Sequence, residues 1–88
     1  MASRTDGNQA SVVAGLRKAG ARVQTLHEVG CGCPDILVGF RGINYLFEIK
    51  RPQGSRLTDR EVKWLEEWPG QASVITTLDE ALRIMGAV

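Results

Sequence analysis

The chain has 88 residues, a length that suits one small domain, and its formal net charge of +1 does not point to any class of partner. No apolar run approaches the roughly 20 residues that a membrane span needs, so no membrane-spanning helix is expected. The first nine residues are polar and do not resemble a signal peptide, so we expect a cytoplasmic protein.

A polar start leads into a helix predicted over about Gly7–Ala19, which Gly20 would end. Asp6 is a candidate N-cap, and Gln9 would complete a pair like a capping box. The apolar positions fall on one stripe at helical spacing, namely Val12, Val13, Leu16 and Ala19. Gln9 lies within the angular range of that stripe, so it either serves the cap or points towards a functional site.

A first strand is predicted over Arg22–Glu28, followed by a glycine-rich loop in which Pro34 makes the approach to Asp35 rigid. The only two cysteines are Cys31 and Cys33, which are too close in sequence for an ordinary disulfide and indicate a reducing compartment. With His27 they would supply three zinc ligands, whereas a structural zinc site needs four at other spacings. Ordinary thiols are the favoured interpretation.

Two strands are predicted to form a hairpin, Ile36–Phe40 and Asn44–Lys50, with the turn at 41–43. Side chains on a strand alternate between the two faces of the sheet. One face of the second strand therefore carries Tyr45, Phe47 and Ile49. The other face carries Leu46, Glu48 and Lys50.

The hairpin is expected to bring Asp35, at the mouth of its first strand, beside Glu48. Two neighbouring carboxylates repel each other, and a shared divalent cation removes that repulsion. Lys50 adds a positive charge next to the cation. The sequence therefore predicts a metal-centred site at this end of the hairpin.

Basic residues gather between positions 50 and 63, and beyond Lys50 they are Arg51, Arg56, Arg60 and Lys63. A patch of this kind holds phosphate groups in nucleic-acid-binding proteins. The alternative is an ordinary solvated loop and helix face.

A second helix is predicted to begin after Thr58, which forms a capping box with Glu61, and to run to about Trp68. Glu61 falls in the middle of the apolar arc of this helix. Its carboxylate must therefore find a partner, either the backbone amides of the first turn or Lys50 and the metal site. Trp64 and Trp68 are expected in the core, with a subunit contact as the alternative.

The last strand is predicted at Ala72–Thr76, and Thr77 caps a final helix over Leu78–Met85 with Glu80 in another capping box. Strand, helix and strand over 44–76 form a right-handed crossover, so the last two strands should be parallel. The predicted fold is a single α/β domain over 1–88, in the order αβββαβα, with a mixed four-stranded sheet flanked by helices.

On this order of elements, Pro34-Asp35 followed by Glu48-Ile49-Lys50 resembles the PD-(D/E)XK nuclease superfamily. The runs Gly-Cys-Pro-Asp, Glu-Ile-Lys-Arg-Pro and Leu-Thr-x5-Trp resemble its VRR-NUC branch, the virus-type replication-repair nucleases. Small stand-alone members of that branch come largely from phages. The resemblance covers nearly the whole chain.

This resemblance implies that Asp35, Glu48 and the backbone carbonyl of Ile49 bind Mg²⁺ or Mn²⁺. It implies that Lys50 orients the attacking water and stabilises charge on the phosphorane. Relatives commonly carry an acidic residue on the first helix, where Gln9 is the nearest match, and Gln in the second helix, where this chain has Glu61. Gln9 and Glu61 are therefore further catalytic candidates. Phosphate contacts are expected from Arg51, Arg56, Arg60 and Lys63.

The expected function is a Mg²⁺- or Mn²⁺-dependent DNA endonuclease that hydrolyses phosphodiester bonds in the cytoplasm of a phage-infected or bacterial cell. Stand-alone members of this branch imply a homodimer that acts on four-way (Holliday) junctions or other branched DNA, as in DNA repair. The alternative is a non-catalytic module that binds branched DNA and retains the nuclease fold. The lack of a carboxylate on the first helix motivates this alternative.

Overall fold

The computed structural model describes residues 7–53 and 56–88. In chain order the elements are α1 (Gly7–Lys18), β1 (Arg22–Thr25), β2 (Ile36–Phe40), β3 (Ile43–Ile49), α2 (Asp59–Glu67), β4 (Ser73–Ile75) and α3 (Leu78–Ile84). The predicted N-cap at Asp6 lies outside the described residues. Within these ranges, no helix has the length and apolarity that crossing a membrane requires.

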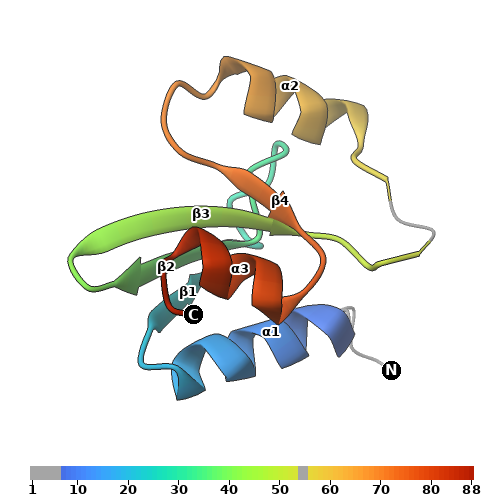
Figure 1. Ribbon diagram of the computed structural model, residues 1–88. Coiled ribbons are helices and arrows are strands. Elements are labelled where there is room, and N and C mark those ends of the chain that lie inside the picture. The colour runs from blue at the N-terminus through green and yellow to red at the C-terminus, as the bar shows by residue number, and fades with distance from the viewer. Residues whose placement is uncertain (1–6, 54–55) are drawn as a thin grey trace.

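The four strands form one sheet in the order β1-β2-β3-β4. β1 and β3 are each antiparallel to β2, which lies between them, and β4 runs parallel to β3. α1 and α3 lie together on one side of the sheet, while α2 stands on the other side (Figure 1). The predicted order αβββαβα and the mixed four-stranded sheet are therefore confirmed.

The hydrophobic core lies between the sheet and the pair formed by α1 and α3. The alternation predicted for β3 is confirmed, because Phe47 and Ile49 are buried in this core and Tyr45 packs against it. The predicted apolar stripe of α1 is confirmed at Val12, Val13 and Leu16, which are all buried. Ala19 is exposed, so the prediction is wrong at that position. The chain leaves the helix after Lys18 and turns at Gly20, whose φ is +99°.

Strand boundaries differ slightly from the prediction. The hairpin turn has only two residues, Arg41 and Gly42, with φ of +52° and +84°, so β3 begins at Ile43. β1 ends at Thr25, and one further bond, from the N–H of Leu26 to the carbonyl of Asp35 at 2.8 Å, continues the ladder before the chain turns away.

Both predicted capping boxes are present, Thr58 with Glu61 and Thr77 with Glu80. The placement of the tryptophans in the core is wrong, since no residue of α2 is buried and Trp68 is 43% exposed. α1 and α3 fill the core on the opposite side of the sheet, so α2 has no closed interior to enter. Its two indole rings, from Trp64 and Trp68, stack on each other with centroids 4.6 Å apart.

Candidate active site

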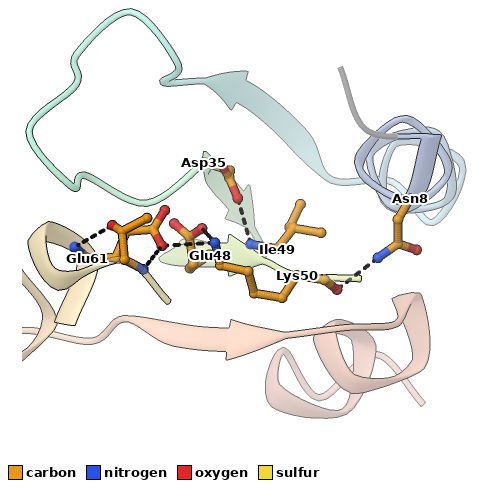
Figure 2. A network of polar contacts seen from close by, with 7 residues as sticks. Asn8, Asp35, Glu48, Ile49, Lys50 and Glu61 are labelled. Atoms are coloured by element: carbon orange, nitrogen blue, oxygen red, sulfur yellow. Dashed lines mark hydrogen bonds and ion pairs between the residues drawn. The ribbon is translucent and has the colours of Figure 1, made fainter. Parts of the chain in front are cut away.

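The candidate site lies where β2 begins and β3 ends. The register of β2 and β3 sets the position of the site, because Ile36 pairs with Phe47 and this pairing places Asp35 beside Glu48. The backbone N–H of Ile49 donates to Oδ2 of Asp35 at 2.7 Å, and this bond aims the carboxylate along β3 (Figure 2). The sequence prediction that the hairpin brings Asp35 beside Glu48 and Lys50 thus agrees with the geometry.

Lys50 joins two carboxylates from different elements. Its Nζ lies 3.3 Å from Oε2 of Glu48 and 2.8 Å from Oε1 of Glu61 (Figure 2). The same oxygen of Glu61 accepts a hydrogen bond from the N–H of Thr58 at 2.8 Å. Both interpretations of Glu61 therefore hold, because it completes the helix cap and also binds Lys50.

Gly32 explains how α2 reaches the site although it stands apart from the core. The residue has φ of +83°, and a Cβ there would collide with the backbone of Arg60 in the first turn of α2. The loop before Asp35 and the start of α2 can therefore meet only because position 32 is glycine. This close approach carries Glu61 to Lys50.

The site concentrates charge where little water reaches it. Glu48 is only 3% exposed, and burial, together with the nearby carboxylates of Asp35 and Glu61, raises the pKa of Glu48 to about 8. Burial also raises the pKa of Asp35, although the Ile49 amide and Lys50 offset part of this effect. Burial by itself would lower the pKa of Lys50, but the carboxylates of Glu61 and Glu48 outweigh it and raise that pKa.

Glu61 behaves differently from the other two acids. Burial by itself would raise its pKa, but the ion pair with Lys50 and the N–H of Thr58 outweigh burial and lower it. The carboxylate of Glu61 is therefore held in its charged form.

The donor set of the site suits a hard divalent cation. Asp35 and Glu48 offer carboxylate oxygens, and Mg²⁺ is commonly held by one or two carboxylates while it keeps several waters. Across the described ranges, no three His, Cys, Asp or Glu side chains gather closely enough to hold a metal by themselves. The zinc alternative with His27, Cys31 and Cys33 is therefore not supported.

The first helix meets the site through a residue that the sequence analysis missed. Asn8 donates from Nδ2 to the carbonyls of Lys50 at 3.0 Å and Thr76 at 2.9 Å, whereas Gln9 lies in a hollow with His27. No contact joins Gln9 to Lys50 or to the two acids of the site in the part of the chain that is described. Asn8 stands four residues before Val12, so it lies on the same face of α1 as the apolar stripe, and this spacing could have predicted that it points inward.

The predicted phosphate-binding residues lie on the surface near the site. Arg51, Arg56, Arg60 and Lys63 are all exposed. Lys63 lies 3.9 Å from the carboxylate of Glu67, one turn along α2.

Comparison with known proteins places this geometry in a known fold. A solved chain described as "VRR_NUC domain" superposes with a TM-score of 0.73 at 19% identity, and the match covers 97% of each chain. This chain has the fold of a VRR_NUC domain. No family model matches the sequence. No curated protein matches it either. The resemblance predicted from the motifs is confirmed at the level of the fold.

The raised pKa of Glu48 predicts how the stability of this VRR_NUC fold depends on pH. The folded state binds the Glu48 proton more tightly than the unfolded chain does, whose ordinary value is 4.5. The stabilisation that this proton gives the folded state is therefore complete below about pH 4.5 and is lost as the pH rises through about 8. We expect the thermal midpoint of the metal-free protein to fall over this range.

Glu48→Gln should make this pH dependence much flatter, because the amide has no proton to lose. Thermal unfolding of both proteins in chelator, at several pH values across that range, measures the difference. An equally steep fall in the variant would show that Glu48 does not cause the pH dependence.

Proposed function

We propose that this protein is a metal-dependent nuclease that hydrolyses phosphodiester bonds of DNA. The observation that carries the proposal is the convergence of Asp35, Glu48 and Lys50 at one end of the β2–β3 hairpin. The VRR_NUC-like fold supports it, because the name of the similar chain denotes a nuclease domain.

The residues of the site have distinct roles in this proposal. Asp35 and Glu48, with the carbonyl of Ile49, would hold Mg²⁺ or Mn²⁺. A divalent cation, when bound, polarises the phosphate and lowers the pKa of a bound water. Lys50, kept charged by its two carboxylate partners, orients that water and neutralises charge that develops on the phosphate.

Residues around the site would support these steps. Glu61 positions the Lys50 ammonium from the first turn of α2. Asn8 holds the backbone of Lys50 in place, and Gln9 stays a catalytic candidate without a contact to the site. Phosphate contacts would come from the surface residues Arg51, Arg56, Arg60 and Lys63.

We further propose a homodimer that acts on branched DNA. The domain is small, so two copies are needed to contact more than one arm of a junction. An exposed apolar side chain on α2 supports an interface there, because Val62 is 38% exposed. A two-fold dimer relates two active sites by symmetry, so each site can make one of a pair of cuts.

A cleavage assay tests the proposal directly. Labelled four-way junctions, flaps and linear duplexes are incubated with the protein and Mg²⁺ or Mn²⁺, and a chelator serves as the control. We expect metal-dependent cleavage, fastest on the junction, with paired nicks at symmetric positions. Binding without cleavage at every metal concentration would instead indicate the non-catalytic module. Unpaired nicks would contradict the dimer.

A further inference from the structure

The face of the sheet on the same side as α2 is open over much of its length. Strand register places Arg22, Gly39 and Asn44 in one row across β1, β2 and β3 on this face. Glu48 lies on the same face, because it is four residues from Asn44 on one strand. The open face therefore links the candidate active site to the hairpin end of the sheet.

Two adjoining hollows mark this surface. One is lined by Leu37, Leu46 and Trp68, and Asn44 lines it as well. The other curves around the hairpin end of the sheet, because Arg22, Gly39 and Asn44 line it from this face, and Phe40 and Ile43 line it from the core face next to Arg41. Asn44 lines both hollows, and at the neighbouring Gly39 a Cβ would meet only Asn44, at an ordinary 3.7 Å. The surface is thus hollowed next to exposed polar groups.

The charge along this face changes from one end to the other. Arg22 is exposed on this face, and Arg41 is exposed in the hairpin turn at its end, with the guanidinium over Phe40. Neither has an ion-pair partner within the described ranges. Between them and Glu48, the residues of β1, β2 and β3 on this face are all uncharged, namely Gln24, Leu37, Gly39, Asn44 and Leu46. A polyanion that leaves the site along this face would meet no further acid on these strands and then reach two arginines.

Arg41 occupies an unfavourable position for its residue type. Its φ of +52° is the left-handed conformation that such a two-residue turn demands, and Asn or Gly adopts it at lower cost. The guanidinium is held over the ring of Phe40, 4.6 Å from the centroid. Local strain of this kind accumulates at functional positions more often than elsewhere.

We propose that this open face receives the DNA backbone that flanks the bond to be cut, with Arg22 on the face and Arg41 at its hairpin end as phosphate contacts. The inference rests on the proposed function. Four residues of β3 separate Glu48 from Asn44, which is about 13 Å of extended strand. Arg22 lies two strand spacings further across the sheet, about 10 Å, and so is about 16 Å from Glu48. At about 3.4 Å per phosphate on each strand, Arg22 contacts DNA roughly five base pairs from the cleaved bond.

The test measures binding of a duplex longer than the 35 Å extent of the chain. All proteins carry Asp35→Asn to prevent cleavage, and binding is followed by fluorescence anisotropy in Mg²⁺ over a range of salt. The two test variants are Arg22→Gln and Arg41→Asn, the second chosen because asparagine suits the turn. The matched control is Arg83→Gln, which removes one positive charge from exposed α3 on the opposite side of the sheet.

Each test variant should reduce the slope of log affinity against log salt by about 0.9, the effect of one lost phosphate contact. Arg83→Gln should keep the parental slope. The thermal midpoint of Arg41→Asn should equal or exceed that of the parent, which separates lost binding from lost folding.

The inference is overturned if both test variants keep the parental affinity and salt slope. It is also overturned if Arg83→Gln loses as much affinity and slope as they do. It is also overturned if the parent does not bind DNA. Failure of the proposed function has a different signature, since the unmodified protein would then cut no DNA in Mg²⁺ or Mn²⁺. The salt slopes of the arginine variants would still test this surface in that case.

Discussion

Asp35→Asn is expected to abolish metal-dependent cleavage while the protein stays folded. The asparagine oxygen can still accept the hydrogen bond from the N–H of Ile49, so the local backbone contact survives. The negative charge that would bind the cation is lost. We expect a decrease in cleavage rate of about a thousand-fold or more, because metal ions supply several kcal/mol of transition-state stabilisation.

The matched control is Asp79→Asn, which makes the same chemical change at an exposed position in the first turn of α3. This variant should cut at close to the parental rate. Single-turnover cleavage of a saturating substrate measures both, and circular dichroism checks the fold. Near-parental cleavage by Asp35→Asn would rule out Asp35 as a metal ligand and remove the main support for the proposed nuclease.

Lys50→Gln should reduce cleavage by about 10²–10³-fold, the usual effect of removing one group that stabilises transition-state charge. At a pH of about 8 or above, where Glu48 carries its charge, it should also lower stability, since Lys50 neutralises both Glu48 and Glu61. Without the ammonium these two carboxylates face each other. We expect a decrease of about 1–2 kcal/mol in the free energy of unfolding, because Glu48 can take up a proton and relieve part of the repulsion.

A double variant separates the two effects of Lys50. Lys50→Gln combined with Glu61→Gln removes the repulsion, while the side-chain amide introduced at position 61 can still serve the helix cap. Its unfolding free energy should return close to the parental value, whereas cleavage should stay low. Denaturant unfolding and single-turnover cleavage measure the two quantities. Recovery of cleavage in the double variant would show that Lys50 acts only through stability.

Much of the candidate site follows from short-range sequence patterns. The strand period places Glu48 and Lys50 on one face, and the hairpin brings Asp35 beside them. Thr58 and Glu61 predict where α2 begins, because a capping box depends on residues only three positions apart. Patterns of this kind are local, so a single sequence is enough to find them.

Other features depend on which face of each element the remaining elements cover. Trp68 has the spacing of a core residue, but α1 and α3 close the core on the other side of the sheet, so Trp68 stays partly exposed. The ion pair between Lys50 and Glu61 requires a loop and a helix to meet at Gly32, which no local pattern predicts.

The αβββαβα order, the two capping boxes and the pair of acids beside a lysine can all be found from the amino-acid sequence alone. The contact between Asn8, rather than Gln9, and the backbone of Lys50, and the open face that Arg22 shares with Glu48, become visible only in the folded chain. The difference is one of range along the chain. Secondary structure and strand faces arise from residues a few positions apart, whereas these contacts join segments whose separation depends on how the whole chain packs.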